Sequence, residues 1–388
     1  MNFALSDEQE FLKEAARGAL SRFKTVEAAR EALDGGELPD LWPTACEAGW
    51  AGLLISEEQG GAGLGLMDGM LVFAELGRVL AGVGLLGHLP ATYLLDRASA
   101  DGLEGLAAGE QRAAFVPARP PGDVDTEWTV DPRLGSARAP APEVGEDGTV
   151  TGELAWVPDA PGADLLVVVG AGGRAAVVRA DDATVEPARG YDPTRSLGHV
   201  AFDGAAGTPL ALGEDDAATA WYIAQALLAA ESVGAVEVAL EVSVQYAKER
   251  FTFGRAIGSY QAVKHELVEI LRRLENSRSL MYYTGWAGQD KADELPVAAS
   301  AFRLTAGHAL DHAARAQISV HGGIGATWST TRRCTSAARS SPGGCWAAPR
   351  TRPTASRASS WPRPARTRRP PSPTSRRGRS AAAGPSAA

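Results

Sequence analysis

Hydrophobic residues recur at helical spacing in two separate parts of this chain. Near the N-terminus, Ser6 and Gln9 form a capping-box pattern, and the apolar residues that follow repeat every three or four positions. A longer repeat of the same kind consists of Ile223, Leu227, Ala230, Val233, Val236, Leu240, Val244 and Ala247. Two further helices are predicted over residues 261–288 and 296–320. Because long helices joined by short loops pack as an antiparallel bundle, we expect one in this part of the chain.

Short β-like runs lie between the two helical parts, separated by Pro, Gly and Asp. They cover residues 113–116, 155–157, 165–169, 175–178 and 199–202. This spacing is typical of a small antiparallel barrel or sandwich. The sequence therefore predicts an α+β fold, mainly α, in which three domains follow one another. These are an N-terminal helical domain (1–112), a middle β domain (113–212) and an incomplete C-terminal antiparallel helix bundle (213–328).

Residues 329–388 differ in composition from the rest of the chain. They contain 13 Arg and nine Pro but no Val, Leu, Ile, Phe or Tyr, so we expect this tail to be disordered. Within a net charge of −9, the tail carries +13 and residues 1–328 carry −22. An acidic body argues against nucleic acid as the main partner. A basic tail that binds nucleic acid or an anionic membrane is the rival interpretation of this segment.

Several other classes of protein and site are disfavoured. No apolar run approaches the 18 residues of a membrane span, and residues 1–22 lack a signal-peptide core, so we expect a cytoplasmic protein. Three cysteines do not form a disulfide framework. The glycine-rich loop at residues 60–65 lacks the Lys-Ser/Thr of a phosphate-binding loop. His308 and His312 lie four residues apart but have no third ligand at suitable spacing, so we predict no metal site.

Three segments resemble the acyl-CoA dehydrogenase family. The run EAGWAGLLISEEQGGAG, which begins at Glu47, is similar to that family's G-W-x-G-L-x-x-P-E-x-x-G-G-x-G pattern. The run YAKERFTFGRAIGSYQAVKH, which begins at Tyr246, is similar to its Y-x-x-x-R-x-x-F-G-x-x-I-x-x-x-Q-x-x-x-H signature. The run HGGIG at His321 resembles a glycine turn that ends the family's next long helix. The resemblance covers about residues 1–328 and is strongest in the predicted bundle.

The resemblance implies an FAD-dependent enzyme that removes two hydrogens from the α and β carbons of an acyl-CoA thioester. In such enzymes a carboxylate takes the α proton, and the β hydrogen leaves as hydride to the flavin. The implied partners are the acyl-CoA substrate, an electron-transfer flavoprotein or similar acceptor, and other subunits of a homo- or hetero-oligomer.

The second motif carries most of the predicted FAD contacts. Arg250 offers a fork of donors suited to a pyrophosphate, and Thr252 adds a hydroxyl next to Phe253. By resemblance, this turn reaches the FAD of a neighbouring subunit, and Gln261 is a further polar contact. The structural alternative is a helix C-cap with a solvated arginine.

Three more residues are assigned to the flavin by resemblance. Gly322 and Gly323 permit close approach to a ligand, although glycines here also serve simply to end a helix. The family usually has Gln where this chain has Ser319. Trp156 corresponds to a tryptophan that borders the flavin, although an isolated aromatic residue is more often part of the core. The family's Thr-Glu-Pro-x-x-Gly-Ser-Asp flavin segment is missing from the middle domain.

The catalytic base is the weakest part of the resemblance. One family position for it corresponds to Ala224, followed by Gln225 where the family has Arg, and the other lies in the acid-free tail. Glu231 lies seven residues after Ala224 and projects from the same helical face, so it is the candidate base. The alternative is a hydrogen-bonded structural glutamate between packed helices.

The resemblance stops abruptly after Trp328, which suggests a shifted reading frame. With suitable codons, restoring one base before Ser329 yields Glu-His-Asp-Ala-Pro-Leu-Tyr-Phe-Arg-Arg, which resembles the family's continuation. Three functional hypotheses follow. The chain is an acyl-CoA dehydrogenase or a base-poor subunit of a heteromeric one, a non-catalytic scaffold of that fold, or an inactive frame-shifted product.

Overall fold

The computed structural model describes residues 4–117, 129–130, 138–139, 141–170, 173–188 and 192–326. All of them belong to the unit Met1–Pro349. The tail, the frame-shift hypothesis and two of the three cysteines lie outside the described residues.

The N-terminal part of the described chain is helical, as expected. The Ser6 hydroxyl accepts the Gln9 N–H and the Gln9 side chain accepts the Ser6 N–H, both at 3.2 Å, which confirms the capping box. The elements are α1 (Asp7–Leu20), α2 (Thr25–Ala32), α3 (Trp42–Glu47), the 3-10 turn η1 (Glu57–Gln59), α4 (Leu66–Arg78), α5 (Leu85–Arg97) and α6 (Leu103–Ala107).

The middle part forms a β-sandwich. One four-stranded sheet has the order β1-β6-β7-β10, and the other has the order β4-β5-β9-β8. The strands are β1 (Ala113–Val116), β4 (Glu143–Val144), β5 (Val150–Pro158), β6 (Leu165–Val169), β7 (Ala175–Arg179), β8 (Thr184–Pro187), β9 (Leu197–Ala205) and β10 (Gly207–Leu210), with a separate short pair β2 (Thr129–Val130) and β3 (Arg138–Ala139) and the 3-10 turn η4 (Ala180–Asp182). Both four-stranded sheets contribute to one apolar core. The expectation of purely antiparallel pairing was wrong at one place, because β1 pairs with β6 in parallel.

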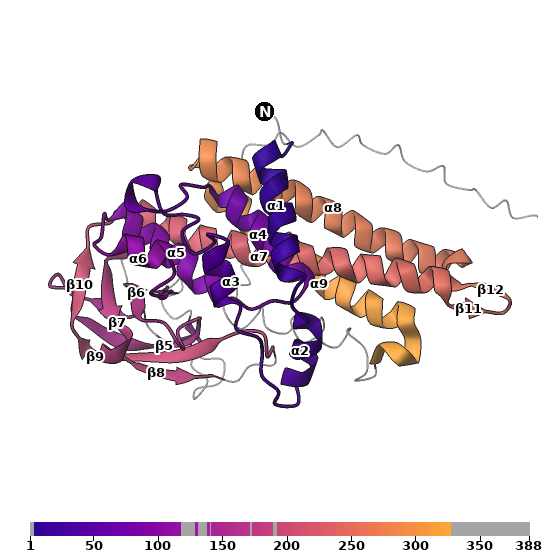
Figure 1. The fold of residues 1–388 in the computed structure, drawn as a ribbon, viewed down its shortest axis with the longest axis horizontal. Helices are drawn as coiled ribbons and strands as arrows, with labels where there is room; N and C mark the ends of the chain where they lie inside the picture. The colour runs from indigo at the N-terminus through magenta and orange to yellow at the C-terminus, as the bar shows by residue number, and fades with distance from the viewer. Residues whose placement is uncertain are drawn as a thin grey trace, which may run out of the picture. The chain divides into compact units, whose positions relative to one another are not determined.

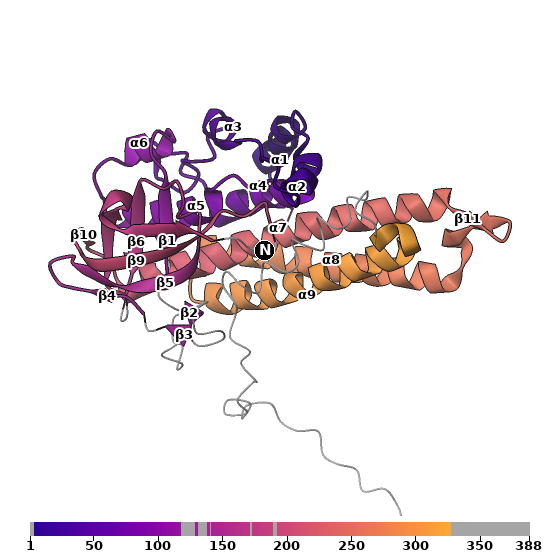
Figure 2. The same ribbon diagram turned by 90° about the horizontal axis from the view of Figure 1, so that it is seen from below.

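The C-terminal part is the predicted helix bundle. Its elements are α7 (Glu214–Glu249), β11 (Phe251–Thr252), β12 (Arg255–Ala256), the 3-10 turn η5 (Ile257–Ser259), α8 (Gln261–Asp290), α9 (Leu295–His321) and the 3-10 turn η6 (Gly322–Ala326). Figures 1 and 2 show that α7 runs from the β-sheets to the β11–β12 hairpin, which lies at the opposite end of the bundle.

The N-terminal helices and the bundle share one hydrophobic core. Ala16 of α1, Met70 of α4, Leu227 of α7 and Phe302 of α9 are fully buried in the same cluster. Figure 2 shows α1–α4 along one side of α7. The successive compositional zones are therefore not independent in packing, because α4 packs against α7 and α8, and α5 packs against α7.

Helix α7 qualifies the argument against a membrane span. It is long and apolar enough to cross a bilayer, but its most apolar 18-residue window is 78% buried inside the protein. Helices that are covered on most sides in a protein core are apolar all round. The apolar composition of α7 therefore fits a core helix.

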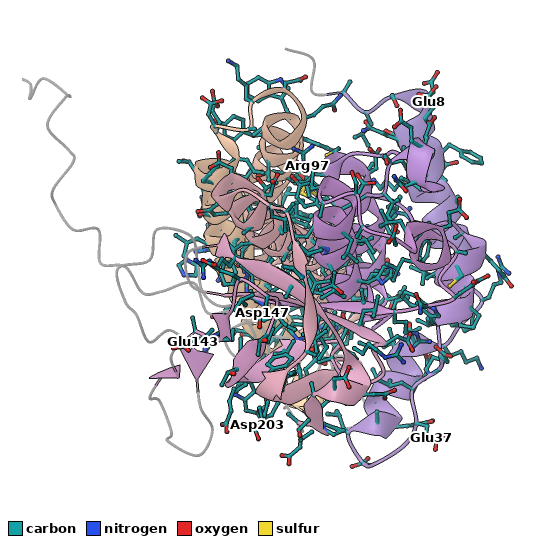
Figure 3. All side chains as sticks on the ribbon, turned by 90° about the vertical axis from the view of Figure 1, so that its left-hand side faces the viewer. Glu8, Glu37, Arg97, Glu143, Asp147 and Asp203 are labelled. Carbon is teal, nitrogen blue, oxygen red and sulfur yellow. The ribbon has the colours of Figure 1, made fainter. Side chains whose placement is uncertain are left out.

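The described surface carries many of the acidic residues. Figure 3 shows the exposed side chains of Glu8, Glu37 and Asp203 at the periphery of the view from the β-sheet end. Solvated carboxylates of this kind account for much of the negative charge of residues 1–328.

Candidate functional site

A close crossing of α4 and α7 positions the candidate base. Gly77 and Gly234 lie at the crossing, and a Cβ at Gly77 would lie 1.9 Å from the carbonyl oxygen of Glu231. A Cβ at Gly234 would lie 1.8 Å from the carbonyl oxygen of Ala74. Glycine at both positions therefore lets the two backbones touch and brings Glu231 beside the end of α4.

Glu231 lines a cavity of about 310 Å³ between the N-terminal helices and the β-sandwich loops. Apolar side chains from α4, α5 and the turn between them form one wall, and these are Phe73, Leu76, Val83, Leu85 and Leu86. The polar part of the lining forms a second wall, which includes Asp40, Arg112, Asp159, Thr194, Arg195 and Glu231. A hollow that combines an apolar wall with convergent polar groups is typical of a small-molecule site.

The carboxylate of Glu231 forms an ion pair with the guanidinium of Arg195. Both side chains are only 15% exposed. On its other side, Arg195 Nε lies 3.9 Å from the buried Asp192 carboxylate, whose Oδ1 accepts the Thr194 hydroxyl at 2.6 Å. A general base in this chemistry needs a dry pocket without a paired cation, so the geometry favours a binding or structural role for Glu231 over proton abstraction.

The position expected for the family's base is apolar. Ala224 is fully buried in a cluster with Ile55 and Leu94. The next residue, Gln225, is 4% exposed and has no hydrogen-bond partner for Nε2 within the described part of the chain. Neither residue is acidic, so this stretch of α7 holds no proton acceptor.

Asp159 links the sandwich to α5 on the polar side of the cavity. Its Oδ2 accepts the Gly87 N–H at 2.8 Å, in the first turn of α5, and its own N–H donates to the Ser196 carbonyl at 2.9 Å. Burial raises the pKa of the Asp159 carboxyl, and the Gly87 N–H and the Arg195 guanidinium oppose this only in part. Sequence reasoning missed both Asp159 and Arg195, because neither belongs to a recognisable motif.

Two of the predicted FAD contacts of the second motif, Thr252 and Phe253, lie in the hairpin at the far end of α7. Thr252 pairs with Arg255, and the two residues between them, Phe253 and Gly254, have φ of +52° and +76°. Two left-handed residues give the type I′ turn that suits a tight hairpin. Phe253 is strained there, and its side chain is 93% exposed.

Polar groups surround this turn. Tyr260 donates its hydroxyl hydrogen to the Thr252 carbonyl at 3.1 Å, and the Arg255 guanidinium lies 4.2 Å from the Tyr260 ring centroid. Arg250 and Gln261 are exposed, and within the described chain the Arg250 guanidinium has no ion-pair partner. The hairpin therefore presents a cation and hydrogen-bonding groups to its surroundings.

The glycine turn lies at the same end of the bundle. His321, the last residue of α9, stacks on Tyr246 of α7 with ring centroids 4.1 Å apart. Gly322, with φ of +61°, and Gly323 follow it and are exposed. The structure thus gathers six predicted residues at one end of the bundle, which are Arg250, Thr252, Phe253, Gln261, Gly322 and Gly323.

The other two predicted residues lie elsewhere. Trp156 sits at a bulge in β5 with φ of +61°, and its ring meets His199 edge-on at 5.0 Å. It is not among the residues that line the cavity with Glu231.

Among the described residues, no group of three or more His, Cys, Asp or Glu side chains is arranged to hold a metal ion. His312 Nε2 lies 3.6 Å from a carboxylate oxygen of Glu266.

Comparison with known proteins shows the family to which this chain is related. The family description "Acyl-CoA dehydrogenase, N-terminal domain" matches residues 6–117, and "Acyl-CoA dehydrogenase, C-terminal domain" matches residues 215–341. The acyl-CoA dehydrogenase IpdE2 of Mycobacterium tuberculosis (strain ATCC 25618 / H37Rv) is 32% identical over 328 residues, which cover 83% of this chain and 87% of that protein. The chain belongs to the acyl-CoA dehydrogenase family. The resemblance drawn from the motifs is confirmed.

Solved structures agree with the fold of this acyl-CoA dehydrogenase. A variant of the "Tcur3481-Tcur3483 steroid ACAD" has a TM-score of 0.75 at 25% identity and covers 88% of this chain and 94% of that one. "PigA with FAD and proline" has a TM-score of 0.75 at 23% identity, with 89% and 96% covered. Members of the family are flavoproteins, and this chain is an oxidoreductase of the acyl-CoA dehydrogenase type.

Proposed function

We propose that this chain binds FAD and an acyl-CoA thioester and takes part in α,β-dehydrogenation as a subunit of an oligomeric enzyme. The observation that carries the proposal is the exposed end of the bundle, where Arg250 and the strained, exposed Phe253 lie together. Backbone strain held at an exposed, polar-rimmed turn indicates a functional contact. A second subunit would cover this turn and receive its donors.

The residues at this end suit a dinucleotide. Arg250 offers a planar fork of donors to a pyrophosphate, and the Thr252 hydroxyl adds another donor. A Cβ built at Gly322 or Gly323 meets no heavy atom of the described residues within 4 Å, so these residues leave space for a ligand beside the turn. When bound, FAD supplies the hydride acceptor for the β hydrogen of the substrate.

The cavity beside Glu231 is the proposed acyl site of the same chain. Its apolar wall from α4 and α5 excludes water from an alkyl or ring group, and the polar wall orients the group within it. In this role Arg195 and Glu231 bind the substrate, and a residue other than Glu231 accepts the α proton.

A base-poor role in a heteromeric enzyme is the second candidate function. Two observations favour it, the apolar surroundings of Ala224 and the ion pair that holds the Glu231 carboxylate. In this case another polypeptide supplies the base. An electron-transfer flavoprotein or a similar acceptor, and a cytoplasmic location, remain parts of the proposal.

Flavin content tests the proposal. We expect the full-length chain, expressed alone and with a companion acyl-CoA dehydrogenase chain, to purify yellow in at least one condition and to absorb at the wavelengths of an oxidised flavin. Arg250→Ala should lower flavin content at least several-fold, whereas Arg315→Ala, an exposed change on α9, should not. Colourless protein in both conditions that does not take up added FAD would support the scaffold hypothesis instead.

The role of Glu231 has its own test. If Glu231 is the base, Glu231→Gln abolishes dye reduction by acyl-CoA at every pH. If another chain supplies the base, the variant keeps a measurable kcat with an unchanged pH profile and shows its effect in KM.

The frame-shift hypothesis is tested by sequencing the DNA across Trp328. If resequencing finds one additional G at this point, the frame continues into the sequence expected for the family. If the DNA reads unambiguously in the present frame, without slippage, and close relatives share that frame, the hypothesis is wrong.

A further inference from the structure

We infer that the Arg195–Glu231 pair selects acyl groups that carry an uncharged hydroxyl at the end that enters the cavity. The inference rests on the proposed acyl-CoA substrate and names the kind of acyl group. It starts from the contrast between the two walls of the cavity, of which one is apolar and the other holds an ion pair.

A plain alkyl group fits the apolar wall but not the pair. If such a group fills the cavity, water leaves Glu231 and Arg195, and no new hydrogen bond replaces it. Removing water from a charged group without compensation is costly. A hydroxyl avoids this cost, because it donates to one carboxylate oxygen of Glu231 and accepts from a guanidinium.

Charge at the polar wall disfavours an anionic ligand. Two carboxylates, Glu231 and Asp192, already pair with the guanidinium of Arg195, and the Asp159 carboxyl also interacts with it. An added ligand carboxylate would compete with Glu231 for a cation that is already shared with Asp192. The second arginine of the cavity lining, Arg112, lies 3.8 Å from Asp40 and stacks on the Trp42 ring, so neither arginine offers the open bidentate site that a carboxylate requires.

An ammonium group is disfavoured for the opposite reason. Glu231 is a carboxylate that faces the cavity, and its charge is balanced by Arg195 in direct contact. A ligand cation bonded to the same carboxylate would lie close to that guanidinium, and like charges at this distance repel. A neutral group that both donates and accepts is the one that fits without displacing the pair.

Loop placement keeps the pair aimed at the cavity. A Cβ at Gly82 would lie 2.0 Å from the Thr194 carbonyl oxygen, so the loop that carries Arg195 packs directly on the turn between α4 and α5. Asp192 fixes the same loop, since its Oδ1 also accepts the Thr194 N–H at 3.0 Å. The polar wall is thus built into the fold, as a specificity site requires.

Binding of matched CoA thioesters tests the inference. The full-length chain loaded with FAD is titrated calorimetrically with short, medium and longer straight-chain acyl-CoAs. At each length the chain end is a methyl, hydroxyl, carboxylate or amine group. We expect the hydroxylated member of at least one length to bind about tenfold to hundredfold more tightly than the methyl member, and both charged members to bind more weakly than the hydroxylated one.

Variants assign the preference to the pair. Arg195→Met/Glu231→Leu removes both charges together, and we expect it to abolish or reverse the preference for the hydroxyl. Because that variant changes packing, Glu231→Gln provides a milder test, and it should reduce the preference without losing the fold. Arg315→Met/Asp311→Leu removes an exposed pair on α9, joined at 3.1 Å, and should leave the preference unchanged.

The outcomes separate the two proposals. If no CoA thioester binds to the FAD-loaded chain, the acyl-CoA proposal fails. If thioesters bind but the methyl member equals or exceeds the hydroxylated one at every length, only the hydroxyl inference is overturned. Tighter binding of an amine or carboxylate member also overturns it. A preference that survives in Arg195→Met/Glu231→Leu shows that other residues cause it.

Discussion

Arginine–glutamate pairs occur in two different settings in this protein. On one side of the bundle, Arg78 of α4 lies 2.7 Å from Glu237 and 3.0 Å from Glu241, both on α7. Arg17 of α1 joins the same group through Glu75 of α4, which is 2% exposed. Arg278 of α8 completes it by pairing with Glu237. This network connects four helices, and each of its cations contacts at least one carboxylate.

The pair in the cavity has similar chemistry but a different environment. Arg195 comes from a loop of the sandwich and Glu231 from α7, and the pair faces a hollow of about 310 Å³. Side chains from four helices surround the Arg78 network, whereas a ligand would have to complete the surroundings of the cavity pair. The difference teaches that ion pairs enclosed between helices hold those helices together, and that an ion pair at a cavity wall is suited to the recognition of a ligand.

Breaking the network should have the largest effect on stability. Arg78→Met leaves the buried Glu75 and the half-buried Glu237 with one cation fewer, so we expect the free energy of unfolding to fall by about 3 kcal/mol. Arg195→Met should cost less, roughly 1 kcal/mol, because Arg195 pairs with two carboxylates, Glu231 and Asp192, whereas Arg78 pairs with three. Urea unfolding of the full-length variants at neutral pH gives both values. Equal losses would contradict the distinction between the two settings.

The pH dependence of Glu237 should sharpen the contrast. Burial alone would raise the pKa of Glu237, but Arg78 and Arg278 outweigh burial and lower it. A carboxylate with a lowered native pKa stabilises the fold above its unfolded pKa, and this contribution is lost as pH falls through the native pKa. We expect Glu237→Gln to cost about 2 kcal/mol at about pH 7 and to approach wild type below about pH 4. A constant difference across this range would argue against the network.

Asp159, at the cavity, should show the opposite and smallest effect. Because burial raises the pKa of its carboxyl, the native state binds the proton more tightly than the unfolded state does. Stability from this group is therefore present below the unfolded pKa and is lost as pH rises through the raised native pKa. Asp159→Asn keeps an acceptor for the Gly87 N–H and should remove a pH-dependent change of roughly 1 kcal/mol. Unfolding curves from about pH 3.5 to about pH 7 span the unfolded pKa of an aspartate and measure this change, and an unchanged slope would disprove the prediction.

Elements with a clear local signal were predicted well. The capping box at Ser6 and Gln9 and the long apolar repeat of α7 depend on contacts within a few residues, so the local sequence contains them. The strands β1 and β6 were also predicted, because both are short, continuous apolar runs. In each case the residues of the element itself carry the whole pattern that predicts its structure.

Elements whose surroundings decide their pattern were missed. Helix α5 is buried on nearly every side and contains Pro90, so it shows neither a polar face nor a helix-like composition. Strands β8 and β10 are edge strands with exposed or partly exposed residues, so they lack the apolar run of a central strand. The parallel pairing of β1 with β6 joins segments about fifty residues apart, and no local pattern records it.

The candidate site divides along the same line. The motif around Arg250 and the glycine turn at Gly322 are each a continuous run of residues. For this reason the sequence alone revealed the family and led us to expect FAD as the cofactor. The sequence alone thus determined the family, the helical and strand zones and the absence of an acid at Ala224, because these depend on residue type and short-range spacing. Only the tertiary structure decided that Glu231 is held by Arg195, 36 residues away, since that pairing arises from helix crossing and loop packing.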